Sequence, residues 1–190
     1  EELSLNTANV EVRGESQDGT VLDFGGQTQG ANGLSATSDG VLFSTFTVKN
    51  TPGDGIRVTG ANGVTFRDLN VTWSGGPQTE NGAYGLYPVQ CQNVLIEGCS
   101  VSYASDAGIY VGQSMNVIVR DSEAFGNVAG IEIENTTGAD VFNNHSYENT
   151  GGLLIFDLPG PPIQGGNSNK IHDNILENNN EPNFAAVLKI

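Results

Sequence analysis

Positively charged residues are scarce in this sequence, with seven Lys and Arg against 22 Asp and Glu and a formal net charge of −15. Surfaces that bind phosphates need clusters of Lys and Arg, so the composition excludes a nucleic-acid-binding protein. Long apolar runs are also lacking, because no stretch approaches the roughly 20 apolar residues of a membrane span. The first residues, Glu1-Glu2-Leu3, show no signal peptide, and we interpret them as a processed or trimmed start.

Cysteine is limited to Cys91 and Cys99. If the segment between them is extended, it spans about 25 Å, well beyond the roughly 7 Å Cα separation of a disulfide. We therefore predict two independent thiols packed as small apolar side chains. Lysine is scarce and glycine abundant, at 26 residues, which disfavours helices. The acidic composition, rich in Asn, Thr and Ser, leads us to expect a secreted or periplasmic protein.

A repeat organises the chain. A glycine followed by a short apolar strand recurs with spacings of 22, 30, 23, 22 and 22 residues. These glycines are Gly33, Gly55, Gly85, Gly108, Gly130 and Gly152. About nine residues after each glycine begins a second segment of alternating apolar residues, such as the one that starts at Val94.

A period of 22 residues with two or three short strands is typical of a coil that buries its apolar face against the coils above and below it. A leucine-rich repeat has a similar period but needs Leu at fixed positions, and the turns here are rich in Asn, Gly and Thr instead. We predict an all-β protein: a single-domain right-handed parallel β-helix, or solenoid, of about seven coils over residues 1–190.

Polar residues at equivalent positions of successive coils indicate ladders. Two sets of asparagines should stack along the solenoid and bond backbone groups. The first set is Asn127, Asn149 and Asn179, and the second is Asn144 and Asn174. A third set of alternating charge should form an outward ladder of ion pairs, namely Arg67, Glu97 and Arg120.

Two coils carry insertions of about eight residues, within segments 72–84 and 157–167. One precedes a glycine-started strand and the other follows one, so we expect both to flank the same sheet from opposite sides. Insertions in repeat folds commonly build the binding face. We therefore place the candidate site on the outward face of the glycine-started sheet.

The predicted outward row of that sheet is Ser35, Arg57, Tyr87, Tyr110, Glu132 and Leu154. Neighbouring tyrosines beside Arg and Glu form the kind of aromatic and charged groove that binds glycans. We assign catalytic candidates to this row: Tyr110, Tyr87, Arg57 and Glu132. Substrate-binding candidates in the insertions and adjoining turns are Trp73, Tyr84, Gln90, Asp106, Gln113, Glu134 and Asp157. The alternative is that Tyr87 and Tyr110 only stack under a folded loop.

Four segments carry a family resemblance that covers nearly the whole chain. They are residues 81–91 (NGAYGLYPVQC), 104–114 (ASDAGIYVGQS), 128–135 (VAGIEIEN) and 149–159 (NTGGLLIFDLP). They resemble a family of bacterial right-handed parallel β-helix repeat proteins of unknown function, whose genes often lie beside that of a c-type cytochrome. The resemblance implies an exported β-helix.

A more distant similarity is to polysaccharide lyases and mannuronan C5-epimerases. The epimerase motif Tyr-Gly-Phe-Asp-Pro-His aligns with residues 84–89, where Tyr84, Gly85 and Pro88 match. Tyr87 and Val89 replace the catalytic Asp and His. The sequence therefore leaves open whether the protein is an enzyme.

Several chemistries are compatible with these residues. In a lyase or epimerase, Tyr87 or Tyr110 would act as the base while Arg57 neutralises the uronate. In a glycosidase, Glu132 and Glu134 would lie about 6.5 Å apart on one strand, within the range that paired carboxylates need.

Cofactor motifs do not decide between these chemistries. The carboxylates offer the oxygen ligands that Ca²⁺ prefers, but no contiguous calcium loop is present, so we assign no metal and keep calcium as an alternative. An alternative explanation of these carboxylates is that they are ordinary surface charges that keep an acidic protein solvated. We place His145 and His172 on the sheet of the second strand, away from the groove.

The ends suggest a further alternative. The chain starts directly with Leu3-Ser4-Leu5, and residues 186–190 have the pattern of the first strand of an eighth coil. We expect either a fragment of a longer solenoid or ends that meet partners. Three functions remain: a protein that binds or modifies a polysaccharide, a structural solenoid that associates through its uncapped ends, or a scaffold for a protein partner.

Overall fold

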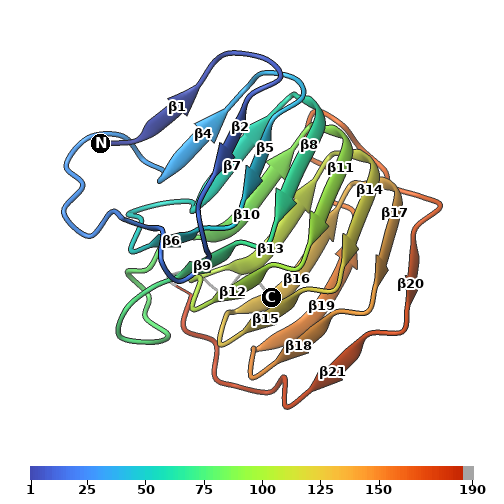
Figure 1. The fold of residues 1–190 in the computed structure, drawn as a ribbon. Coiled ribbons are helices and arrows are strands. Elements are labelled where there is room, and N and C mark those ends of the chain that lie inside the picture. Colours follow the sequence, from blue (N-terminus) through green and yellow to red (C-terminus); the bar gives the residue numbers. More distant parts are fainter. Residues whose placement is uncertain (186–190) are drawn as a thin grey trace.

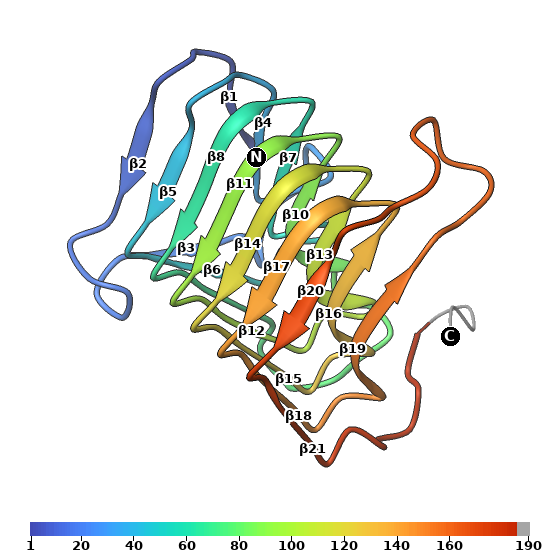
Figure 2. The same ribbon diagram turned by 90° about the vertical axis from the view of Figure 1, so that its right-hand side faces the viewer.

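The computed structural model describes residues 1–185, and these residues form 21 β-strands and no helix (Figure 1). The strands make three sheets of seven parallel strands each, so every coil contributes one strand to each sheet. The coils stack along one axis, with the three sheets forming three faces of the stack (Figure 2). The expected parallel β-helix of about seven coils is confirmed.

The strands of each sheet follow the chain at intervals of three. The first sheet holds β1 (Leu3–Leu5), β4 (Leu34–Ala36), β7 (Ile56–Thr59), β10 (Tyr84–Val89), β13 (Ala107–Gly112), β16 (Ala129–Glu134) and β19 (Gly151–Phe156). The second holds β2 (Glu11–Arg13), β5 (Leu42–Ser44), β8 (Asn62–Arg67), β11 (Gln92–Glu97), β14 (Met115–Arg120), β17 (Thr137–Phe142) and β20 (Lys170–His172). The third holds β3 (Val21–Asp23), β6 (Thr47–Lys49), β9 (Asn70–Thr72), β12 (Ser100–Ser102), β15 (Glu123–Phe125), β18 (His145–Tyr147) and β21 (Ile175–Glu177).

The core is a set of apolar columns inside the coils. Along the first sheet, Leu86 pairs with Ile56 on one side and with Ile109 on the other, and Ile109 pairs with Ile131. All four side chains are fully buried. Burying an aliphatic side chain of this size contributes about 1.5–3 kcal/mol, and β-branched residues suit the extended backbone.

The glycine repeat has a packing cause. A Cβ at Gly55 would lie 2.5 Å from the carbonyl oxygen of Gly85, and a Cβ at Gly85 would lie 2.6 Å from that of Gly108. Successive coils therefore approach so closely at the start of these first-sheet strands that only glycine fits.

The second alternating segment of each coil is divided into two strands by a bend. The bend residues take a positive φ, for example 50° at Asp68, 51° at Asp121 and 55° at Asn143. Asp and Asn tolerate this left-handed conformation better than most residues. His145 consequently lies on β18 of the third sheet, and its assignment to the second sheet was wrong, whereas His172 lies on β20 of the second sheet.

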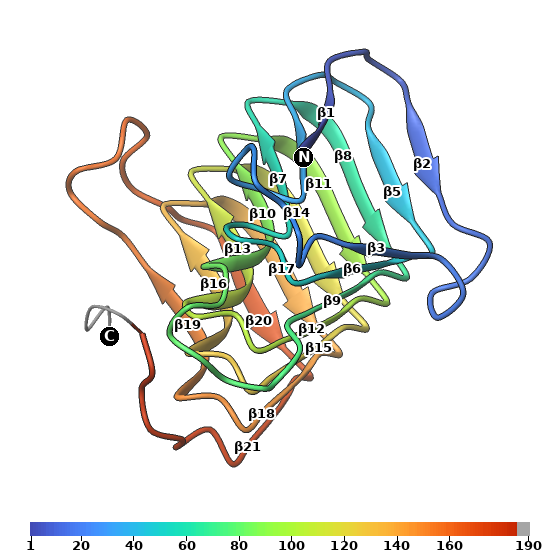
Figure 3. The same ribbon diagram turned by 90° about the vertical axis from the view of Figure 1, so that its left-hand side faces the viewer.

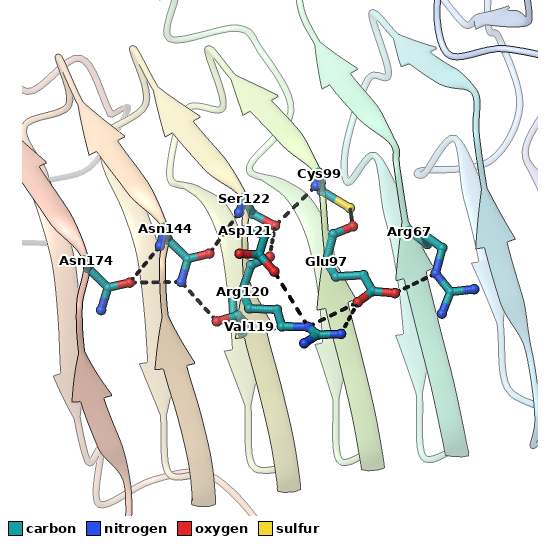
Figure 4. A network of polar contacts seen from close by, with 9 residues as sticks. All are labelled: Arg67, Glu97, Cys99, Val119, Arg120, Asp121, Ser122, Asn144 and Asn174. Atoms are coloured by element: carbon teal, nitrogen blue, oxygen red, sulfur yellow. Dashed lines mark hydrogen bonds and ion pairs between the residues drawn. The ribbon is translucent and has the colours of Figure 1, made fainter.

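The asparagine ladders form as predicted. Asn127 Nδ2 donates to Asn149 Oδ1 at 3.1 Å, and Asn149 Nδ2 donates to Asn179 Oδ1 at 2.9 Å. Asn144 Nδ2 donates in the same way to Asn174 Oδ1 at 3.0 Å (Figure 4). Each ladder satisfies buried amides at a corner where the backbone turns away from its sheet.

The predicted charge ladder crosses the outer face of the second sheet (Figure 4). Glu97 accepts from Arg67 Nε at 2.5 Å and from Arg120 Nη2 at 2.6 Å. Hydrogen bonds from Arg67 and then Arg120 lower the pKa of Glu97 below its ordinary value. Because both arginine side chains are about two-fifths exposed, at 43% and 40%, each pair contributes only about 1 kcal/mol or less.

The first insertion forms the loop 73–83 between β9 and β10 (Figure 3). Asn81 Nδ2 donates to the carbonyl oxygen of Tyr103 at 2.7 Å, and Ser105 Oγ donates to that of Asn81 at 2.7 Å. The loop is thus held at the corner between the third and first sheets.

The second insertion forms the loop 157–169 between β19 and β20 and projects from the stack (Figure 2). Asn135 exchanges two hydrogen bonds with the backbone of Leu158, at 2.8 and 2.9 Å. Asn135 follows β16 at the corner between the first and second sheets, so the two insertions flank the first sheet from opposite sides, as predicted.

The expected strand at residues 186–190 lies outside the described residues. Among the described residues, several large apolar side chains are exposed on the first and last coils. They include Leu3, Val21, Ile171, Ile175 and Leu176.

Candidate functional site

The outward row of the first sheet has the predicted register. Arg57 pairs with Ser35 and with Tyr87, and Glu132 pairs with Tyr110 and with Leu154. One residue from each of six neighbouring strands of the first sheet therefore lines one face. These strands are β4, β7, β10, β13, β16 and β19.

Three tyrosines form a cluster on this face. The ring centroid of Tyr84 lies 4.6 Å from that of Tyr87 and 4.7 Å from that of Tyr110, and Tyr87 meets Tyr110 edge to face at 4.9 Å. Tilted and edge-to-face pairs at these distances are favourable arrangements of aromatic rings. Tyr87 and Tyr110 therefore contact each other edge to face and are not stacked, and a pocket opens beside them.

This tyrosine–carboxylate pocket has a volume of about 250 Å³. It is lined by Tyr84, Asp106, Tyr110, Glu132, Glu134, Phe156 and Leu158. Its carboxylates are buried, with Asp106 3% exposed and Glu132 and Glu134 each 6% exposed. Carboxylates are rarely buried to this extent unless they are paired with hydrogen-bond donors.

Tyrosine hydroxyls supply two of those donors. Tyr110 donates a short hydrogen bond to Glu134 Oε2, and Tyr84 hydrogen-bonds Asp106. Burial raises the pKa of Tyr110 far above its ordinary value, and the bonded Glu134 raises it further. Burial and then the charge of Asp106 do the same to Tyr84.

The raised pKa values of these tyrosines bear on the lyase hypothesis, in which a tyrosine acts as the base. A tyrosine base at neutral pH needs a lowered pKa. Burial raises the pKa of Tyr87 as well, and the nearby Arg57 lowers it only in part. Tyr84 and Tyr110 therefore serve as hydrogen-bond donors, and the raised pKa values of the three tyrosines do not favour a tyrosinate base.

Arg57 lies between Ser35 and Tyr87 in the row. Its guanidinium carbon is 4.9 Å from the centroid of the Tyr87 ring, and its Nη1 lies 3.7 Å from Asp54 Oδ2. Arg57 and Tyr87 lie beside the pocket and are not among its lining residues. The arginine is engaged with Asp54 and the tyrosine ring, which leaves the pocket itself rich in carboxylate.

The placement of Trp73 in the groove was wrong. Its side chain is 4% exposed within the main core, and Nε1 donates to the carbonyl oxygen of Thr51 at 2.8 Å. The ring fills the corner where the first insertion leaves the coil, and Gly82 packs against its edge. A large apolar ring gains more from this burial than from exposure on a wall.

Gln90 and Gln113 also lie away from the pocket. Both occupy the corner between the first and second sheets with φ near 55°, and Gln90 Nε2 donates to Gln113 Oε1 at 3.2 Å. Asp157 is exposed at the start of the second insertion, and its neighbours Phe156 and Leu158 line the pocket instead. Phe156 pairs with Glu134, so the alternation that selected Leu154 would also have found it.

No group of three or more His, Cys, Asp or Glu side chains within residues 1–185 is arranged to hold a metal ion. His145 contacts Glu177 at 2.9 Å and His172 contacts Asp140 at 3.0 Å, both outside the first sheet. Cys91 and Cys99 are free and buried as predicted, and burial raises the pKa of both thiols. The described residues also form no helix long and apolar enough to cross a membrane.

Fold and site together define a parallel β-helix with a tyrosine–carboxylate pocket on its first sheet, beside the second insertion. Residues 54–188 match the family model described as "Right handed beta helix region", and the chain belongs to this family. No curated protein matches the chain.

Proposed function

We propose that this protein binds a neutral glycan in the tyrosine–carboxylate pocket. The observation that carries the proposal is the pairing of tyrosine hydroxyls with buried carboxylates, as in Tyr110 with Glu134 and Tyr84 with Asp106. Sugar rings pack on aromatic faces, and their hydroxyls donate to carboxylates. The two insertions at the sides of the sheet would confine a chain along the outward row.

Charge selects among glycans. Three carboxylates line the pocket, and the whole chain carries a formal net charge of −15. A polyuronate would bring further negative charge to this face, where Arg57 is already engaged by Asp54. A neutral polysaccharide therefore fits better than an acidic one.

Among the reactions considered, the geometry favours glycoside hydrolysis over β-elimination. Glu132 and Glu134 point outward from one strand two residues apart, so their Cα atoms are about 6.5 Å apart. Side chains that leave one strand in the same direction from this spacing can bring their carboxyl groups within the roughly 5–9.5 Å that paired catalytic carboxylates span. Glu134 accepts from Tyr110 and would act as the oriented carboxylate, with Glu132 as its partner.

The experiment is a screen of neutral and acidic polysaccharides that follows retention and the release of reducing ends or unsaturated products, first with calcium and then with chelator. We expect retention on a neutral glycan that E134Q and Y110F weaken by about tenfold. Tyr147→Phe, on the third sheet, is the matched control and should retain wild-type binding. Products lost in E132Q would identify a hydrolase, and retention only on polyuronates would overturn the proposal.

The alternative is a non-catalytic structural or partner-binding solenoid that associates through its end coils. It would depend on the exposed apolar side chains of the first and last described coils, such as Val21 and Ile175. Light scattering across a concentration series tests it, because growth in mass without glycan retention would favour self-association. We also propose an exported location, secreted or periplasmic, on the basis of the acidic composition.

A further inference from the structure

A second cleft lies at the corner between the third and first sheets, away from the tyrosine–carboxylate pocket. Its volume is about 410 Å³. It is lined by Pro77, Tyr103, Gly126, Glu148, Glu181, Pro182 and Phe184, and we call it the Tyr103 cleft. The lining combines aromatic and proline side chains with two carboxylates and contains no Lys, Arg or His.

Segments far apart in the sequence build this cleft. Pro77 comes from the first insertion, and Pro182 and Phe184 come from the segment after β21. Thr79 Oγ1 donates to the carbonyl oxygen of Phe184 at 2.8 Å, which joins the two segments. Glu181 N donates to the carbonyl oxygen of Asn149 at 3.1 Å and fixes the returning segment to the coil.

Together with Phe184, Tyr103 contributes the large aromatic side chains of the cleft lining. Tyr103 has φ of 69°, which is rare for a bulky side chain. The ring lies over Gly126 in the next coil, where an added Cβ would come within 2.7 Å of ring atoms and 3.9 Å of Pro77. Glycine at this position leaves the space that the Tyr103 ring occupies beside the cleft.

Negative charge surrounds this surface. Glu148 and Glu181 are exposed lining residues with no ion pair among residues 1–185. Aromatic faces carry negative charge density and attract cations, most strongly when the cation is poorly hydrated. Apolar walls exclude a strongly hydrated metal ion, whereas a cation covered by methyl groups satisfies both the walls and the carboxylates.

We propose that the Tyr103 cleft binds a small soluble quaternary ammonium ion, with its methyl groups on Tyr103 and Phe184 and its charge facing Glu148 and Glu181. The proposal is independent of the glycan pocket. Charge complementarity selects this occupant, because an uncharged ligand of the same shape gains nothing from the carboxylates.

Isothermal titration calorimetry of the full chain with choline tests the proposal. Dimethylbutanol, the uncharged carbon isostere of choline, should bind about tenfold more weakly or not at all. Tyr103→Asn should lower choline affinity by about tenfold while keeping the fold, because Asn50 and Asn178 adopt the same positive φ at equivalent corners.

The double variant E148Q/E181Q should also weaken choline binding. Its charge-matched control is E15Q/D18N, on the exposed loop after β2, which should bind choline as the wild type does. Equal binding of choline and dimethylbutanol would overturn the proposal, as would unchanged affinity in Tyr103→Asn. Sedimentation with phosphatidylcholine vesicles separates the two sources of the headgroup, because a protein that pellets with vesicles and ignores free choline does not bind the soluble ion.

Discussion

The Tyr110 hydroxyl donates a short hydrogen bond to Glu134, which lies on the neighbouring strand of the next coil. Both side chains are buried, at 5% and 6% exposure. One bond thus links two coils, orients a carboxylate in the candidate site and keeps the phenol protonated.

Tyr110→Phe should destabilise the fold by about 1–3 kcal/mol, because the Glu134 carboxylate would stay buried without this donor. Urea unfolding measures the change. Tyr110→Phe combined with Glu134→Gln should cost less than the sum of the single changes, because the two residues share one interaction. Additive effects in this cycle would show that the bond contributes little.

Asn149→Ala should cost about 2–4 kcal/mol, because Asn149 serves several buried backbone and side-chain groups at once. Its Nδ2 donates to the carbonyl oxygen of Ala124 at 3.0 Å, and its Oδ1 accepts from Asn127 N at 2.9 Å. Asn62→Ala is the matched control, since Asn62 belongs to an exposed ladder with Asn93. Similar shifts in melting temperature for the two variants would contradict the assignment of the buried ladder as the stabilising one.

The sequence was sufficient to predict the coils, the outward row and the ladders, because each depends on a residue type that recurs with the coil period. Glycine spacing reports the close approach of backbones, as at Gly55 and Gly85. The asparagine spacing indicates backbone groups that need a hydrogen-bond partner at each corner of the coil.

The features that the sequence did not predict depend on how the loops pack against the coils. Trp73 folds back into the core, and this depends on the space left at a corner rather than on alternation. Loop 157–169 brings Leu158 to the pocket by pairing with Asn135. The Tyr103 cleft needs the segment after β21 to return to the first insertion, and no repeat encodes that contact.

Gly85→Ala should destabilise the protein by about 1–3 kcal/mol or more, because the new methyl group has no space. It would lie 2.2 Å from a Val101 methyl group and 2.6 Å from the Gly108 carbonyl oxygen. The backbone of the next coil cannot retreat without breaking its own ladder. Gly160→Ala, where an added Cβ meets nothing within 4 Å, should be nearly neutral. Chemical denaturation of both variants makes the comparison, and a neutral Gly85→Ala would refute the close-packing cause of the repeat.

His172 should titrate above the ordinary histidine value of about 6.5. Its pKa is raised first by the hydrogen bond to Asp173 and then by that to Asp140. Because the folded-state pKa is the higher one, the stabilisation by protonated His172 is fully present below the unfolded-state pKa. It is lost as the pH rises through the folded-state pKa.

The imidazole is exposed, so we expect a shift in the pKa of His172 that NMR titration detects rather than a large change in stability. Asp173→Asn should lower the measured pKa, whereas Asp68→Asn, at a distant bend, should leave it unchanged. An unchanged pKa in Asp173→Asn would remove this ion pair as the cause.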